Sequence, residues 1–306
     1  RTIVLAGLAV VLAVAAALAA QLLTRLIGAV TSLTYHGHLI WHLVPPAGGP
    51  RSVPVLLFIP VAGAIVVGLM ARYGSAAIRG HGIPEVMERV LFGESRIPAR
   101  VLFLKPLSAA IAIGTGGPFG AEGPIIMTGG AFGSLFAQGF HLSASERKTL
   151  LVAGAAAGMA AIFATPIAAV LLAVELLLFE WKPRSFIPVA LASIVAAACR
   201  TPLLGRGPLF PMAPHDWASW EILAVAAVVG IASGAASSIA TWLVYMCEDG
   251  FAKLPLHQMW WPAIGGLAVG LGGLIEPRAL GVGYDTIGAL LTGHLVGVTV
   301  VPLLIV

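Results

Sequence analysis

Two long stretches of this chain, residues 2–30 and 53–71, contain no charged side chain apart from Arg25. Each is long enough to cross a bilayer core of about 30 Å as a helix. Charged residues occupy only 10% of the 306 positions and hydrophobic residues 59%, whereas soluble domains carry about 25% charged residues. A surface with so little charge would not stay solvated. We therefore predict an all-α, polytopic membrane protein in contact with a lipid bilayer.

The distribution of the charged residues argues against nucleic acid as a partner. The net charge of +4 is spread over loops and forms no basic helix of the kind that binds nucleic acid. Loops enriched in Lys and Arg are typical of the cytoplasmic side of a membrane protein. The first residue is Arg1, so we expect a natural N-terminus that is missing or processed. No cleavage site follows residues 2–20, and we do not interpret them as a signal peptide.

The later apolar segments are shorter and interrupted. They cover residues 101–119, 124–140, 149–164, 166–179, 185–199, 222–246, 258–275 and 286–306. Several are too short to cross a bilayer without tilting, and Gly or Pro breaks them at residues 116–118, 123–124 and 165–166. Broken helices of this kind are typical of transporters with a binding site near the bilayer midplane. A simple helical bundle is the alternative.

Two of the breaks carry specific chemistry: Gly-His-Gly-Ile-Pro-Glu at residues 80–85 and Gly-Ala-Glu-Gly-Pro at residues 120–124. Each is a glycine-rich loop leading into a helix, and Pro84 suits the first helical position. Free N–H groups and the helix dipole make such a terminus an anion site. Glu122 lies where the anion would bind, so its carboxylate could compete with the anion until it is protonated. The alternative is an ordinary helix-cap acid.

These motifs resemble those of a known family. Residues 80–84 resemble the G-S-G-I-P motif of the CLC chloride channels and exchangers, and residues 120–124 resemble their G-[KR]-E-G-P motif. Lys105 stands where the family commonly has a lysine, and residues 281–285 (GVGYD) resemble its G-x-G-Y segment. The longest match includes residues 149–151, residues 154–158, Phe163, Pro166 and Glu175. The chain is identified as a member of the CLC family, of the prokaryotic type.

The resemblance implies an inverted repeat of tilted and broken helices. Residues 1–200 would form the first transmembrane repeat, and residues 217–306 the first part of a second, incomplete repeat. It also implies a homodimer in the cell membrane, with much of the interface in residues 166–199, and chloride as the transported ion. No enzymatic reaction or cofactor is expected. The chain stops before the family's G-x-F-x-P motif, so we expect the natural protein to be longer.

The resemblance also assigns roles to residues. Glu122 corresponds to the external gating glutamate, and His81 to the serine that coordinates the central anion. The expected anion-binding residues are His81, Gly82, Ile83, Gly120 and Gly123. Pro124 favours chloride over fluoride, because the family's fluoride exporters carry a different residue there.

Proton coupling is the part of the resemblance in which this sequence departs from the bacterial exchangers. Leu176 stands where bacterial exchangers have their internal proton-transfer glutamate, and Glu175 precedes it. An α-helix turns successive residues by about 100°, which predicts that Glu175 points toward a different face. We therefore favour passive conduction or loosely coupled exchange. A proton-coupled antiporter that uses Glu175 or His81 as a non-standard relay is the alternative, since histidine titrates near neutral pH.

Two substitutions depart from the family pattern, and one histidine cluster suggests a rival class of protein. His81 replaces the usual serine, and it either contacts the anion or merely lines the vestibule. Ala121 replaces a basic residue, which weakens the attraction of anions from outside. His36, His38 and His42 cluster between two apolar stretches, with His38 and His42 spaced as on one helical face, and could hold a metal or haem. We favour an interfacial loop and no metal site, because no carboxylate or cysteine lies nearby.

Overall fold

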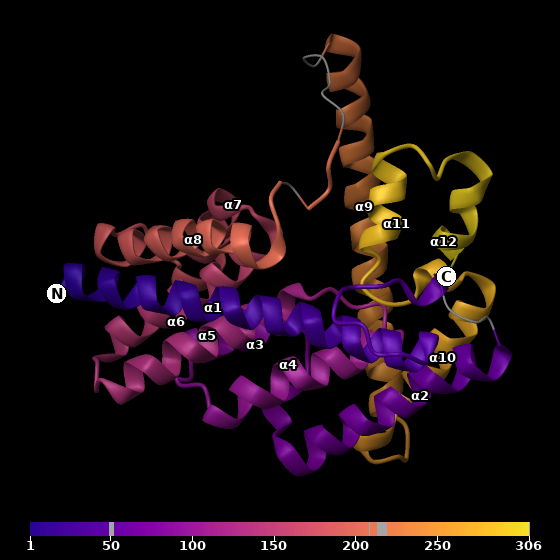
Figure 1. Ribbon diagram of the computed structural model, residues 1–306, viewed down its shortest axis with the longest axis horizontal. Coiled ribbons are helices and arrows are strands. Elements are labelled where there is room, and N and C mark those ends of the chain that lie inside the picture. Colours follow the sequence, from indigo (N-terminus) through magenta and orange to yellow (C-terminus); the bar gives the residue numbers. More distant parts are fainter. Residues whose placement is uncertain (49–51, 208, 213–218, 306) are drawn as a thin grey trace.

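The computed structural model describes residues 1–48, 52–207, 209–212 and 219–305 (Figure 1). Within these ranges the regular structure is helical throughout, without strands. The α-helices are α1 (Thr2–Thr31), α2 (Val53–Leu69), α3 (Ile83–Leu91), α4 (Ala99–Gly114), α5 (Glu122–Gly139), α6 (Ala144–Phe163), α7 (Pro166–Leu172), α8 (Pro183–Leu204), α9 (Trp220–Ala252), α10 (Trp261–Ile275), α11 (Tyr284–Leu291) and α12 (Val301–Ile305).

Helices long and apolar enough to cross a membrane appear where the sequence predicts them. α1 and α2 continue into π-helical turns, so that their spans cover Thr2–His36 and Val53–Gly74. Pro183–Leu204 and Trp220–Ala252 complete the set of four among the described residues. The predicted all-α, polytopic membrane protein is thus confirmed. The other helices are shorter, as the Gly and Pro breaks in the sequence indicate.

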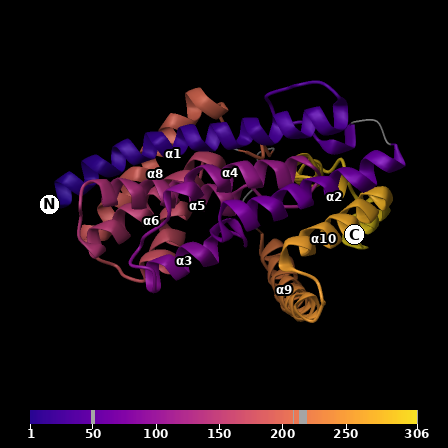
Figure 2. The same cartoon turned by 90° about the horizontal axis from the view of Figure 1, so that it is seen from below.

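The main core lies where α1, α5, α6 and α8 pack together (Figures 1 and 2). α1 contributes a buried stripe that includes Leu5, Leu12 and Leu23. α5 and α6 approach so closely that a Cβ on Gly129 would clash with the carbonyl oxygen of Gly154, and one on Gly154 with that of Gly129. Small residues that let backbones touch are the usual means of packing helices in a membrane, where the hydrophobic effect does not drive association.

α10 packs against α2 in the same manner, and so joins the later part of the chain to the earlier part. A Cβ on Gly266 would lie 2.8 Å from the carbonyl oxygen of Pro60, and one on Gly270 would lie 2.7 Å from that of Leu57. The contact between α2 and α10 therefore depends on glycine, and it fixes one wall of the cavity described below.

α9 differs from every other long helix. None of its 33 residues is buried, and in Figure 1 it runs across the direction of α1 and α8. Its surface is apolar on all sides, including Ile222, Val228 and Trp242. A helix with this character is covered by lipid or by other protein.

The last apolar segment is not one helix. The sequence predicts a segment over residues 286–306, but α11 ends at Leu291, a 3-10 turn follows at Gly297–Val300, and α12 is short. Gly293 and Gly297 adopt φ of +74° and +61°, values that an L-amino acid avoids and that end a right-handed helix. The predicted start of the second repeat, residue 217, lies outside the described residues.

Candidate functional site

The loop before α3 forms the first half of the site. Gly80 and Gly82 have φ of +80° and +117°, so only glycine suits these two turns. α3 begins at Ile83, which places Pro84 at its second position rather than the predicted first. The Gly82 N–H donates to Glu85 Oε2 at 2.5 Å. Gly82 can therefore contribute its N–H to an anion site only when Glu85 releases it.

The loop before α5 forms the second half. Glu122 is the first residue of α5 and is half-buried. Its carboxyl carbon lies 3.4 Å from the place that a Cβ would occupy on Gly120, so the side chain folds back over this glycine. A capping box needs an acid at the third helical position, and Glu122 is at the first. Among the described residues, none of the ion pairs involves Glu122.

The two loops touch through their backbones although 40 residues separate them. A Cβ on Gly82 would clash with the carbonyl oxygen of Gly123, and a Cβ on Gly123 would clash with that of His81. The same position on Gly123 lies 3.2 Å from His81 Nδ1. The structure thus brings together His81, Gly82 and Gly123, three of the predicted anion-binding residues. Ile83 follows Gly82 as the first residue of α3, and Gly120 lies in the loop before α5.

Lys105 of α4 binds the backbone of the first loop. Its side chain is only 3% exposed, and its Nζ donates to the carbonyl oxygens of Ile78 at 2.9 Å and Gly80 at 2.8 Å. A buried ammonium needs such partners. These bonds turn two carbonyl oxygens toward α4 and leave a positive charge beneath the loop. The sequence indicated Lys105 only through the family resemblance.

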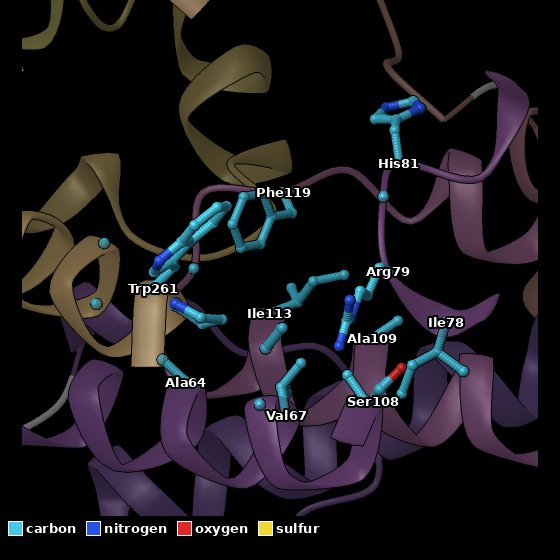
Figure 3. Close-up of a pocket in the computed structure, with 18 of the residues that line it drawn as sticks. Ala64, Val67, Ile78, Arg79, His81, Ser108, Ala109, Ile113, Phe119 and Trp261 are labelled. Atoms are coloured by element: carbon cyan, nitrogen blue, oxygen red, sulfur yellow. The ribbon is translucent and has the colours of Figure 1, made fainter. Parts of the chain in front are cut away.

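A cavity of about 670 Å³ lies beside the two loops, between α2, α4 and α10 (Figure 3). Its titratable lining residues are Arg79, His81 and Lys105, and no Asp or Glu of the described chain lines it. Most of the remaining wall is apolar, and it includes Ile113 and Trp261. In Figure 3 the ring of His81 points away from the group formed by Arg79, Ile113 and Ser108. The charged lining of this cavity is thus entirely basic.

The GVGYD segment joins the site from the later part of the chain. The Gly281 N–H donates to the Gly116 carbonyl oxygen at 3.0 Å, which ties this segment to the glycine-rich approach to Glu122. Tyr284 begins α11, and its hydroxyl is buried without a hydrogen-bond partner among the described residues. Phe210 packs edge-on against the ring of Tyr284.

Sequence reasoning missed Tyr284 and Arg79 as functional candidates. Tyr284 entered only as part of a motif, and its one available signal was a tyrosine placed at a helix start directly after Gly-Val-Gly. Arg79 directly precedes the GHGIP motif, but its position in the cavity depends on how α2, α4 and α10 pack. No local pattern carries that information.

Glu175 lies apart from this site. It belongs to the π-helical turn Ala173–Leu178, and both it and Leu176 are exposed, whereas Val174 and Leu177 are buried. The prediction that Glu175 and Leu176 point toward different faces assumed an α-helix, and the segment is a π-helical turn in which both side chains are exposed.

The three histidines do not converge on a metal. His36 ends a π-helical turn, and residues 37–45 are irregular, so the predicted loop is present and the helical spacing of His38 and His42 is not. His38 Nδ1 lies 2.8 Å from the carbonyl oxygen of His36. Across the described ranges, no group of three or more His, Cys, Asp or Glu side chains is arranged to hold a metal ion.

Comparison with known proteins agrees with this geometry. The family model described as voltage-gated chloride channel matches residues 62–306, which include both motif loops, the cavity lining apart from Pro60, and Tyr284. The chain belongs to this family. The family that the sequence motifs predict is thus confirmed.

The curated CLC relatives are longer than this chain. A ClcB-like chloride channel protein of Ralstonia nicotianae is 27% identical over 248 residues, covering 79% of this chain and 58% of the relative. The voltage-gated ClC-type chloride channel ClcB of Escherichia coli is 29% identical over 240 residues, covering 77% and 57%. Chloride channel protein CLC-f of Arabidopsis thaliana is 28% identical over 252 residues, covering 77% and 31%. The chain therefore spans less than two thirds of these relatives.

Two solved CLC structures share the fold. A slow cyanobacterial Cl⁻/H⁺ antiporter superposes with a TM-score of 0.73 at 19% identity, covering 94% of this chain and 66% of the other. A CLC-type fluoride/proton antiporter superposes with a TM-score of 0.76 at 22% identity, covering 98% and 75%. At these identities the similarity establishes the CLC fold alone.

Proposed function

We propose that this protein transports anions, chloride above all, across a cell membrane and that Glu122 gates the pathway. The observation that carries the proposal is the meeting of two helix N-terminal loops beside a cavity whose charged lining is basic. The names of the relatives in Ralstonia nicotianae and Escherichia coli refer to chloride, which supports chloride as the ion.

The arrangement suits an anion for electrostatic reasons. The N-termini of α3 and α5 each carry N–H groups without a partner inside the helix and the equivalent of about half a positive charge, and the Gly82 N–H before α3 becomes available when Glu85 releases it. The buried Lys105 adds a full charge under one loop, and His81 adds a ring donor beside the other. Losing water costs an anion much free energy, and such fixed donors offset that cost. The described cavity presents no carboxylate that would repel the ion.

Glu122 has the properties that a gate needs. It lies at the first position of α5, belongs to none of the ion pairs of the described chain, and stays half-buried where an anion would approach. Its position rules out the usual capping box, which weakens the alternative of a structural cap. The hydroxyl of Tyr284, buried and without a partner in the described part of the chain, offers a donor to the group that occupies the site, whether the carboxylate or the anion.

We propose passive conduction or loosely coupled exchange as the mode of transport. A proton needs a titratable group that can be reached from the inside, and Leu176 offers none. Glu175 is exposed and is not among the residues that line the described cavity. Tight coupling through Glu175 or His81 is the second candidate, and the two antiporters among the structural neighbours favour it.

Chloride efflux from proteoliposomes containing the full-length protein tests both statements. We expect efflux that is absent from protein-free liposomes, and little uphill proton movement when a chloride gradient is the only driving force. Absence of efflux would overturn the transport proposal. Proton pumping at a fixed stoichiometry would overturn passive conduction, and its loss in Glu175→Gln or His81→Ser would identify the relay.

We also propose a homodimer. α7 and α8 expose large apolar side chains within the segment that the sequence assigns to the interface, including Ile167, Ile187 and Ile194. Ile187 and Ile194 are seven residues apart on α8 and so share a helical face. A second copy in the membrane would cover that face.

A further inference from the structure

Arg79 reaches into the cavity from a position that the family motifs do not include. It follows the 3-10 turn Ala76–Ile78 and directly precedes Gly80. In Figure 3 its side chain extends toward Ala109 and Ile113, whereas the ring of His81 points in the opposite direction. Its Nη1 donates to Gln258 Oε1 at 2.9 Å. Gln258 belongs to the 3-10 turn before α10, so the later part of the chain holds this guanidinium in place.

Arg79 and Lys105 differ in the donors that they can offer to a ligand. Lys105 is buried and uses its ammonium to bind the Ile78 and Gly80 carbonyl oxygens. Arg79 is exposed, and within the described part of the chain one of its five N–H donors is taken, by Gln258. Arg79 is therefore the cation of the cavity that has donors available for an ion from solution.

We propose that Arg79 is an anion-capture residue: a small monovalent anion binds its guanidinium in the cavity before moving to the loops at His81 and Glu122, and Gln258 positions the guanidinium. This inference rests on the proposed transport function and adds a site to it. A guanidinium is more weakly hydrated than an ammonium and presents several N–H donors to a ligand. A cavity with apolar walls and charged groups of one sign concentrates the electric field, which raises the local concentration of ions of the opposite charge.

The chain provides a matched control in Arg72. It lies on the π-helical turn Met70–Gly74, seven residues before Arg79, and it also contacts the turn before α10, through Met259 Sδ at 4.0 Å. Arg72 does not line the cavity, and its guanidinium lies over the ring of Tyr73. Arg72→Gln therefore removes the same charge from the same region without changing the cavity wall.

The first experiment measures anion flux through the full-length protein against chloride concentration, varied on each side of the bilayer. We expect Arg79→Gln to raise the apparent chloride KM on one side by about fivefold, the factor that one charge 4 Å from an anion gives in water. Maximal flux should change less. The effect should shrink at high ionic strength. Arg79→Lys should keep most of the affinity, Gln258→Leu should cost about twofold through lost positioning, and Arg72→Gln should have no effect.

Equal shifts in Arg79→Gln and Arg72→Gln, or no shift in either, would overturn the capture site while leaving the transport proposal intact. Absence of flux in the wild-type protein would instead overturn the transport proposal. If Arg79→Gln does not fold, Gln258→Leu carries the test, and an unchanged KM in that variant would overturn the proposal.

A second experiment does not depend on transport. Ala64 of α2 lines the cavity, so Ala64→Cys, in a protein with Cys199→Ser and Cys247→Ser, reports the local ion concentration. An anionic methanethiosulfonate should label it faster than a cationic one of similar size, and Arg79→Gln should lower this rate ratio by fivefold or more. An unchanged ratio would overturn the proposal, and so would a thiol that neither reagent labels.

Discussion

Glu85 and Glu122 are both acids in the first turn of a helix that follows a glycine-rich loop, but they lie in different positions. Glu85 is at the third position of α3, where its carboxylate reaches back to the Gly82 N–H. Glu122 is at the first position of α5 and folds over Gly120. The sequence could predict both helix starts, because Gly and Pro mark them. It could not predict which N–H groups the acids reach, since the two acids differ by two positions relative to the first residue of their helices.

Removing the charge of Glu122 should remove the gate. With Glu122→Gln, the side chain no longer competes for N–H groups as an anion, so chloride flux should lose its dependence on external pH. Flux measured in liposomes between pH 5 and 8 checks this. Glu88→Gln, an exposed position on α3, is the control and should keep the wild-type profile. A wild-type pH dependence in Glu122→Ala would contradict the assignment.

The contact between the two loops should tolerate no side chain. Gly123→Ala places a methyl group against the carbonyl oxygen of His81, and forced overpacking costs about 1–3 kcal/mol. The thermal midpoint of the protein in detergent should fall accordingly. Gly139→Ala at the end of the same helix, where nothing lies within 4 Å, should leave the midpoint unchanged or slightly higher. Equal midpoints for the two variants would show that the loops are not in contact.

At the scale of elements, the sequence predicts the long helices well because their apolar content leaves no other fold in a bilayer. It predicts poorly where the local pattern is compatible with several backbones. Residues 173–178 have the apolar sequence of a buried α-helix but adopt a π-helical turn. His38 and His42 have the spacing of neighbours on a helix but lie in an irregular loop. In these segments tertiary packing decides the backbone, and a single sequence does not contain that information.

The turn between α7 and α8 should respond to pH. Glu180 accepts hydrogen bonds from Lys182 Nζ at 2.6 Å and from Ser185 Oγ at 2.7 Å. These two partners hold its pKa below the usual range. Because the folded pKa lies below the unfolded one, the stabilisation is present above the unfolded pKa and is lost as pH falls through the folded pKa.

Ser185→Ala tests this linkage. At pH 7 the variant should be less stable by about 1 kcal/mol, the typical size of one hydrogen bond, and the difference should narrow toward pH 3–4. Thermal midpoints of both proteins across this range provide the measurement. Ser193→Ala on α8 is the control, because Ser193 donates to the Val189 carbonyl oxygen and no titratable group is involved. A Ser185→Ala effect that is independent of pH would contradict the role of Glu180.

For the whole molecule, the family and the all-α membrane fold could be predicted from the sequence, because the motifs recur in order along most of the chain. Which surfaces meet other protein could not. α9 exposes its full circumference, and α7 and α8 expose one face. Lipid and protein present similar apolar surfaces to a helix, so sequence hydropathy does not distinguish them.

The predicted homodimer can be tested on α8. Full-length protein in mild detergent should have the mass of a dimer at several concentrations, measured by light scattering. Ile187→Trp combined with Ile194→Trp should shift the population to monomer, because two indole rings do not fit a packed interface. Val11→Trp at an exposed position of α1 should leave the dimer intact. A wild-type protein that is monomeric at every concentration would exclude the interface.

The carbonyl-to-glycine contact between α5 and α6 bears on the rate at which the proposed gate opens and on how that rate depends on temperature. Because α5 and α6 are in backbone contact at Gly129 and Gly154, we expect α5 to keep its place against α6 while the proposed gate opens by rotation about the side-chain bonds of Glu122. Such rotations break few contacts, and we expect opening rates to depend only weakly on temperature. The helices would then stay in place while the side chain of Glu122 moves, and the gate would open within the time that a single side chain takes to change rotamer.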